Sequence, residues 1–141
     1  MQSDQVGLTQ ANRPPRNPVR FTLTEKLTIE HVMPQAWQTY WPLPANAKAD
    51  PLTEQKAIMR RETVLNTLGN LTLITGNFNS SLQNAAWKDK KPELLTYGKL
   101  NLTQYFHGQD ANEWDEAAIR MRTEHLFKLL LGMWPDASKV A

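Results

Sequence analysis

Three short segments carry side chains whose types and spacing suit the hydrolysis of a phosphodiester bond. Residues 30–34 read Glu-His-Val-Met-Pro, residues 69–74 read Gly-Asn-Leu-Thr-Leu-Ile, and residues 77–81 read Asn-Phe-Asn-Ser-Ser. This reaction needs a nucleophilic water, a base that takes its proton, and positive charge beside the phosphorane and the leaving oxygen. An unperturbed imidazole changes charge near neutral pH, so His31 is the candidate general base.

The remaining polar side chains of these segments are candidate metal ligands and supports. One divalent cation, Mg²⁺ or Mn²⁺, is expected to supply the positive charge, and Mg²⁺ prefers oxygen ligands. Glu30 and the side-chain oxygen of Asn79 are the candidate ligands. Asn70 is expected to hydrogen-bond the backbone of the loop that carries His31 and so to fix its angle. Asn79 is also a plausible plain helix cap, and Asn70 is structural under either interpretation.

The spacing of apolar residues predicts the elements that hold these side chains. Residues 27–32 alternate and stop at Pro34, which predicts a short strand, and residues 71–74 predict a second one. A turn at 76–77 then leads into a helix over 79–88, capped by Asn79 or Ser80. Neighbours in a strand point to opposite faces. Glu30 and His31 therefore share one site only if the strand end twists or bulges, or if the phosphate lies between base and metal.

Other elements are expected around this centre. Residues 35–52 form an irregular insertion packed by aromatic side chains, and Thr53 caps a helix that stops at Gly69. Pro92 opens a short helix through residue 97. Asn112 caps a long helix that runs to about residue 134. Its expected core stripe consists of Ile119, Leu126, Leu130 and Met133.

Composition bounds the class of protein. The chain has 141 residues, of which 40% are apolar and 21% charged, as expected of one soluble domain. Because cysteine is absent, disulfides, zinc ribbons and thiol nucleophiles are excluded, and any metal must be held by nitrogen and oxygen. The net charge of +2 is too small to indicate a nucleic-acid partner by itself. No apolar run predicts a membrane span or secretory signal, so the cytoplasm is the expected location.

The three segments together resemble the His-Asn-His (HNH, His-Me finger) nucleases. Residues 30–34 resemble the acid-His-aliphatic-x-Pro strand of that family, Asn70 resembles its middle Asn, and Asn79 falls nine positions later, where its third residue lies. The resemblance implies an α+β fold, with a ββα-metal core surrounded by additional helices. It also implies catalytic roles for His31, Asn70 and Asn79. Glu30 stands where Asp is commoner, and the insertion after His31 is long for this motif.

A narrower resemblance is to the C-terminal nuclease domain of GmrSD-type restriction enzymes. It rests on Leu-Gly-Asn-Leu-Thr-Leu-Ile at 68–74, on Asn-Ser-Ser-Leu-Gln-Asn at 79–84, and on Trp87 and Lys90. It covers residues 20–135 and implies DNA as substrate, 5′-phosphate products, and a role in phage defence. In that family an N-terminal nucleotide-hydrolysing domain usually precedes the nuclease. This chain lacks that partner domain, so the resemblance does not extend to nucleotide dependence or to recognition of modified phage DNA.

Lysines beyond the third segment are candidate DNA contacts. Lys88, Lys90 and Lys91 form a basic cluster, which fits contact with DNA phosphates and an ordinary solvated face equally well. Lys90 is the first candidate for contact with DNA because it falls at the family's lysine position, and Lys88 is the second. Asn84 is equally a site residue or a helix residue making a local hydrogen bond.

These observations predict a nuclease domain over residues 21–135, with an N-terminal tail or linker over 1–20 and a C-terminal tail over 136–141. The predicted function is a metal-dependent DNA endonuclease. The alternative is an inactive HNH-fold module that only binds DNA or a partner protein. A third possibility, a structural domain of a longer enzyme, predicts that replacing His31 alters stability but no reaction.

Overall fold

Two antiparallel strands form the only sheet among the residues described by the computed structural model, which are 26–75, 82–98 and 100–133. Strand β1 (Leu27–His31) pairs with β2 (Leu71–Thr75), and His31 lies opposite Leu71. Both strands predicted from the alternation of apolar residues are confirmed. Their register places the end of β1 beside the start of β2, where Asn70 precedes the strand. The two predicted tails, over 1–20 and 136–141, lie outside the described residues.

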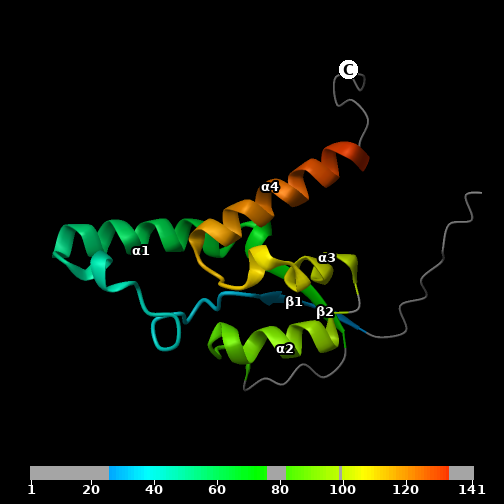
Figure 1. Cartoon of the computed structure of the whole chain (residues 1–141), viewed down its shortest axis with the longest axis horizontal. Coiled ribbons are helices and arrows are strands. Elements are labelled where there is room, and N and C mark those ends of the chain that lie inside the picture. The colour runs from blue at the N-terminus through cyan, green and yellow to red at the C-terminus, as the bar shows by residue number, and fades with distance from the viewer. Residues whose placement is uncertain (1–25, 76–81, 99, 134–141) are drawn as a thin grey trace, which may run out of the picture.

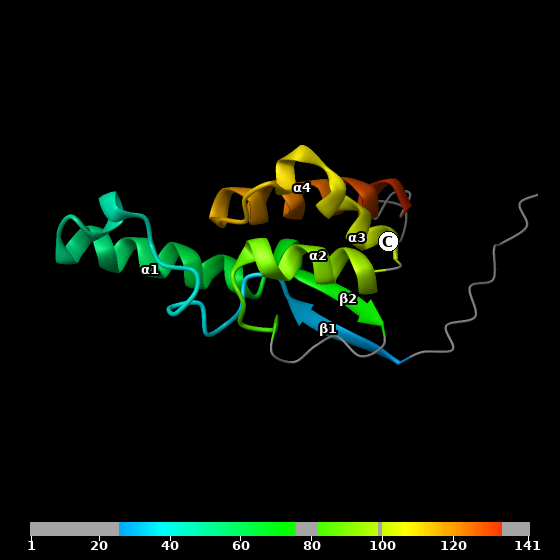
Figure 2. The ribbon, with the colours of Figure 1, turned by 60° about the horizontal axis from the view of Figure 1, so that its bottom comes forward.

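The helices complete an α+β architecture, as expected (Figure 1). In the described part of the chain they are α1 (Pro51–Leu65), α2 (Trp87–Tyr97), α3 (Asn101–Gln104) and α4 (Glu116–Met133). Short 3-10 turns occupy Ala45–Lys48, Leu68–Asn70, Tyr105–His107 and Gln109–Ala111. Helix α2 runs alongside the strands, and α4 packs against the turn that precedes β2 (Figure 2). None of the helices described here has the length and apolar character that crossing a bilayer requires.

Aromatic residues from three segments build the core. Trp87, at the start of α2, lies 5.3 Å from Trp114 and 6.3 Å from Trp41 between ring centroids. The insertion contributes Trp37 and Trp41, both buried, which confirms that aromatic side chains pack it. Trp87 therefore packs among aromatic side chains of the insertion and of the segment that precedes α4.

Two helices begin at residues other than the predicted caps. Asp50 caps α1 in place of Thr53, because its Oδ1 accepts hydrogen bonds from the backbone of Leu52 and Thr53, each at 3.0 Å. Pro51 then occupies the first helical position, where its fixed φ fits. Asp115 precedes α4 in place of Asn112, and its Oδ1 accepts from the backbone of Ala118 at 2.8 Å. A separate 3-10 turn ends just before residue 112.

The helix predicted over 79–88 is confirmed only for its last two residues among those described. Residues 82–86 form turns, and α2 starts at Trp87 and continues through Pro92 rather than opening there. The carbonyl of Gln83 accepts the ammonium of Lys90 at 2.6 Å instead of a helical N–H. The predicted caps Asn79 and Ser80 lie outside the described residues.

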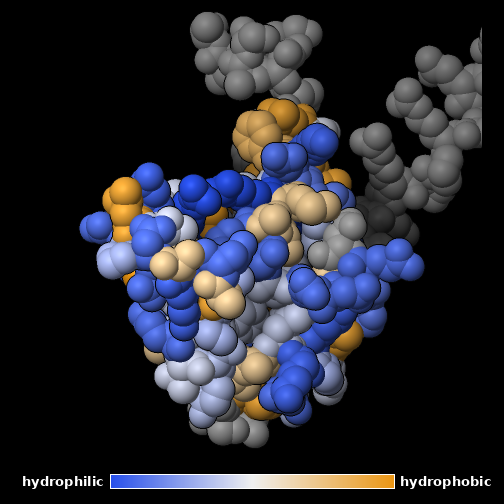
Figure 3. Space-filling view, turned by 60° about the vertical axis from the view of Figure 1, so that its left-hand side comes forward, coloured by the Kyte–Doolittle hydropathy of each residue, from blue (hydrophilic) through white to orange (hydrophobic). Residues whose placement is uncertain are grey.

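The apolar stripe of α4 is buried only in its first half. Ile119 and Leu126 are buried, whereas Leu130 and Met133 are 41% and 72% exposed. Beyond Leu126 the helix extends past the elements that it packs against, and apolar side chains gather over this end at the top of Figure 3. The predicted stripe therefore contributes two of its four residues to the core.

The turn before β2 is clamped onto α4. A Cβ added to Gly69 would lie 2.1 Å from the carbonyl oxygen of Ile119, so only glycine allows this approach. The fully buried Arg122 of α4 donates hydrogen bonds of 2.8 Å to the carbonyls of Gly69 and Leu71. Gly69 was predicted to stop the preceding helix, but α1 ends earlier, at Leu65, and Gly69 serves this helix contact instead.

Candidate active site

His31 ends β1 at the edge of a pocket of about 290 Å³. The pocket is lined by Ile29, Glu30, His31, Pro34, Gln35, Ala36, Gln83 and Asn84. Three of the candidate residues, Glu30, His31 and Asn84, therefore come together although more than 50 positions of sequence separate the first two from the third. The strand end accommodates Glu30 and His31 at one pocket, which the alternation of an ideal strand would oppose.

Asn66 orients the imidazole of His31. Its Oδ1 lies 3.0 Å from Nε2 of His31, and Gln35 Nε2 donates to the same oxygen at 3.4 Å. An amide oxygen only accepts hydrogen bonds, so this contact places the ring proton on Nε2 and leaves the lone pair of a neutral ring on Nδ1. The ring is thereby set as a base whose free nitrogen is Nδ1.

Sequence reasoning missed Asn66. It is the residue just after α1, at the helix C-cap, and an Asn in that position is an ordinary helix end. Its contact with His31 joins residues 35 positions apart. Only the return of α1 toward β1 brings the two side chains together, and no local pattern encodes that return.

Asn70 holds the loop that follows His31. Its Oδ1 accepts from the backbone N–H of Met33 at 2.8 Å, and its Nδ2 donates to the carbonyl of Met33 at 2.8 Å. Nδ2 also donates to the carbonyl of Leu65 at 2.9 Å, and Oδ1 accepts from Trp114 Nε1 at 3.2 Å. The side chain is fully buried and uses all four of its hydrogen-bonding positions. The loop contact expected of Asn70 from the sequence is present.

A buried ion pair braces the other side of the strand end. The ammonium of Lys90 lies 2.6 Å from Oε1 of Glu30 and donates to the carbonyls of His31 and Gln83, each at 2.6 Å. These three acceptors match its three protons. Burial lowers the pKa of Lys90 below its ordinary value, and the hydrogen bond with Glu30 works in the opposite direction. The group thus ties β1 to the turn before α2.

The location of Lys90 corrects its expected role. Its side chain has no exposed surface, so in this structure its ammonium does not reach a DNA phosphate. The basic cluster that looked uniform in sequence is divided by the helix, because Lys88 is exposed while Lys90 points into the protein. Asn84, at the pocket, and Lys88 remain candidates for DNA contact.

The described residues supply only part of the expected metal site. Oε1 of Glu30 is paired with the Lys90 ammonium, a charge that opposes a cation at the same oxygen. Within ranges 26–75, 82–98 and 100–133, no three His, Cys, Asp or Glu side chains converge in a way that holds a metal ion. The second expected ligand, Asn79, lies outside the described residues. Of the two expected ligands, the described residues therefore contain only Glu30, and its carboxylate is paired with Lys90.

Comparison with known proteins identifies a family. A family model described as "GmrSD restriction endonucleases, C-terminal domain" matches residues 5–129, which include both strands, α1, α2 and most of α4. No curated protein and no solved structure matches the chain. The matched range contains every residue of the pocket that holds His31.

Proposed function

Because the chain belongs to the family of GmrSD restriction endonuclease C-terminal domains, we propose that it hydrolyses DNA phosphodiester bonds with His31 as the general base. The observation that carries this proposal is the contact between His31 Nε2 and Asn66 Oδ1. It supports an oriented ring that, when neutral, carries its proton on Nε2 and its lone pair on Nδ1, at the edge of an open pocket. General-base catalysis needs both a defined tautomer and access to the substrate.

The proposed reaction is a displacement at phosphorus. Nδ1 of His31 takes a proton from a water molecule while the water oxygen forms a bond to phosphorus, and the bond from phosphorus to the 3′ oxygen breaks. The leaving oxygen is protonated by solvent, giving a 3′-hydroxyl and a 5′-phosphate. Asn66 keeps the hydrogen bond to Nε2 as the ring becomes positive, which stabilises the imidazolium.

The HNH interpretation and its metal are part of this proposal. Strands β1 and β2 with α2 would be the ββα unit, and Glu30 with Asn79 would hold one Mg²⁺ or Mn²⁺. When bound, such an ion supplies positive charge beside the phosphorane and the leaving oxygen. We also propose a restriction role against phage DNA, together with a nucleotide-hydrolysing partner domain outside this chain. Both proposals rest on the family resemblance, because the nuclease domain of that family usually follows a nucleotide-hydrolysing domain.

A second candidate function has one observation in its favour. Lys90 already neutralises Glu30, as would suit a chain that keeps the fold but binds no metal. Such a chain would be an inactive module that binds DNA or a partner protein. It would have no need of the contact with Asn66 that orients the His31 ring, so the endonuclease remains the better supported proposal.

Plasmid nicking tests the proposal directly. The purified chain is incubated with supercoiled plasmid in Mg²⁺ or Mn²⁺, with EDTA, and as His31→Ala. Loss of a general base lowers the rate by about 10²–10⁴-fold. His107→Ala is the matched control, because this His is exposed and distant in sequence, and it should cut like the wild type. Wild-type cutting that persists in a folded His31→Ala variant would disprove the role of His31. A wild type inert in both metals, and unable to bind Mn²⁺ by calorimetry, would favour the inactive module.

A further inference from the structure

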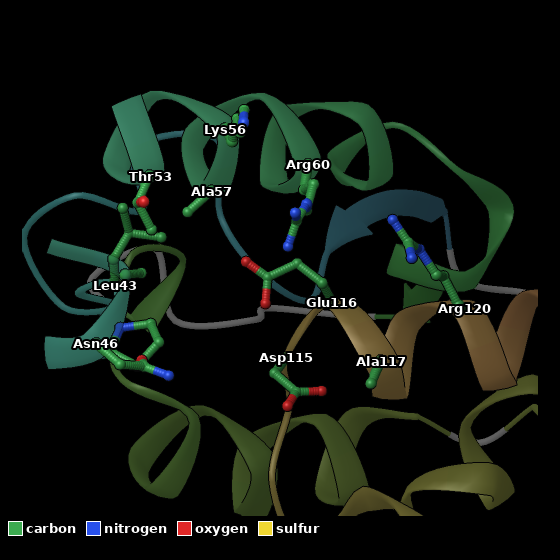
Figure 4. Close-up of a pocket in the computed structure, with 12 residues that line it drawn as sticks. Leu43, Asn46, Thr53, Lys56, Ala57, Arg60, Asp115, Glu116, Ala117 and Arg120 are labelled. Carbon is green, nitrogen blue, oxygen red and sulfur yellow. The ribbon is translucent and has the colours of Figure 1, made fainter. Parts of the chain in front are cut away.

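We propose that the groove between α1 and the start of α4 binds the phosphate backbone of DNA at a distance from the His31 pocket, an inference that rests on the proposed function (Figure 4). The groove has a volume of about 590 Å³, roughly twice that of the His31 pocket. Its walls come from α1, from α4, and from the turn Ala45–Lys48. No expected site residue lines it.

Three cations line the groove without protein partners. Lys56 and Arg60 lie one turn apart on α1, and Arg120 lies on α4. All three are exposed, and within the described residues none forms an ion pair or side-chain hydrogen bond. Figure 4 shows the side chains of Arg60 and Arg120 projecting from facing helices into the space between them. Their charge is therefore available to an external anion.

The two acidic side chains of the groove, Asp115 and Glu116, already interact with protein groups. Oε1 of Glu116 accepts from Arg61 at 2.5 Å, and Arg61 is itself buried. Oδ1 of Asp115 accepts the backbone N–H of Ala118, and its charge faces the positive end of α4. Each carboxylate contacts a neighbour that is not one of the three cations. The lining holds these three cations and two acids, so its charged side chains sum to one positive charge (3 − 2).

This arrangement suits phosphodiesters better than other anions. A guanidinium presents two parallel N–H groups that match the oxygens of a phosphate, and two such groups face each other here. The groove is open and its free groups are charged, which is typical of contacts to a nucleic-acid backbone. Lys56 lies ten residues before Asn66 along α1, or about 15 Å. That distance corresponds to about four phosphates of one strand, so one duplex can reach the groove and the His31 pocket.

The test measures DNA binding without cleavage. A fluorescent duplex of about 25 base pairs is titrated in EDTA with the full chain and with Arg60→Gln/Arg120→Gln. The matched control is Lys26→Gln/Lys128→Gln, which removes the same charge from exposed positions outside the groove. At 0.1 M salt the groove variant should bind at least about tenfold more weakly, with a salt slope reduced by nearly two, because each lost phosphate contact removes about 0.9. The control should change affinity less than about threefold.

Several results would overturn the proposal. Binding equal to wild type in the groove variant, or an equal loss in the control variant, would show that the groove has no special part. Displacement of the duplex by millimolar pyrophosphate, abolished in the groove variant alone, would identify a site for small phosphates instead. Failure of the nuclease proposal looks different. If the wild type never cuts DNA but its DNA binding needs Arg60 and Arg120, the groove proposal stands and the nuclease proposal fails. If the wild type cuts DNA and the groove variant binds DNA as tightly as the wild type, the nuclease proposal stands and the groove proposal fails.

Discussion

The His31 pocket and the groove between α1 and α4 both carry polar side chains, but they use them in opposite ways. Around His31, the amide of Asn70 and the ammonium of Lys90 are buried, and both are fully hydrogen-bonded to protein groups. In the groove, Arg60 and Arg120 are exposed and have no ion-pair partner in the described part of the chain. Around His31, the polar groups are hydrogen-bonded within the protein and fix its geometry. In the groove, the polar groups are available to a ligand.

The difference follows from what each region is proposed to do. A general base works only when its angle and tautomer are fixed before the substrate arrives, and such preorganisation accounts for large rate factors. Contact with a phosphate backbone tolerates small displacements, because the attraction is long-ranged and carries no sequence information. Substitutions of the buried polar residues around His31 should therefore lower stability, whereas substitutions in the groove should lower the affinity for DNA alone.

The largest expected effect is that of Asn70→Ala. The substitution leaves both polar groups of Met33, the carbonyl of Leu65 and Nε1 of Trp114 without their partner in the interior. Each such buried group costs roughly 1–3 kcal/mol, so the free energy of unfolding should fall by at least about 4 kcal/mol. Urea denaturation followed by tryptophan fluorescence measures it. The exposed Asn112→Ala should change it by less than about 0.5 kcal/mol. A loss below about 1 kcal/mol for Asn70→Ala would contradict the account of this network.

The next largest effect compares a buried cation with an exposed one. Lys90→Met leaves the Glu30 carboxylate buried without its counter-ion and should lower the free energy of unfolding by about 3 kcal/mol. Lys56→Met, in the groove, should change it by no more than about 0.5 kcal/mol. Both values come from denaturant titrations of the same chain.

A double-mutant cycle sharpens this comparison. Glu30→Gln/Lys90→Met should lose less stability than the two single variants added together, because neither partner then leaves a buried charge behind. Strict additivity would mean that the two groups do not interact as the structure shows. A large loss in Lys56→Met would mean that the groove cations also support the fold.

Lys90 also shows where sequence reasoning reached its limit. Lys88 and Lys90 are indistinguishable as charges in a basic run, and only the phase of α2 puts one in solvent and the other against β1. That phase depends on where α2 begins, and the helix start is set by turns before Trp87 rather than by a recognisable cap. The hydrogen bond from the Lys90 ammonium to the carbonyl of His31 joins residues 59 positions apart in the sequence. Interactions of this range leave no local signal.

Other features were predictable because their causes are local. The alternation of apolar residues predicted both strands. Asn70 was predicted to hydrogen-bond the loop that carries His31, and the antiparallel pairing of the strands brings it to that loop. The groove was not predictable, because Arg60 and Arg120 are ordinary exposed helix residues until α1 and α4 are packed together. Asn66 was missed for the same reason.

Asn66 gives the smallest effect and the most specific one. It is exposed, so Asn66→Ala should lower the free energy of unfolding by less than about 1 kcal/mol. Plasmid cutting should nevertheless slow by about 10–100-fold, the range found when groups that orient a metal-binding His are removed. Equal rates in Asn66→Ala and wild type would show that the ring needs no such support.

The pH dependence separates this positioning role from a purely structural one. In Asn66→Asp a carboxylate lies beside Nε2 and favours the protonated imidazole, which cannot act as a base. The acid limb of the pH–rate profile should therefore move to higher pH, while Asn112→Asp leaves it in place. An unshifted limb in a folded, active Asn66→Asp variant would place the rate-limiting proton transfer on a group other than His31, because only a base in contact with residue 66 responds to the new charge.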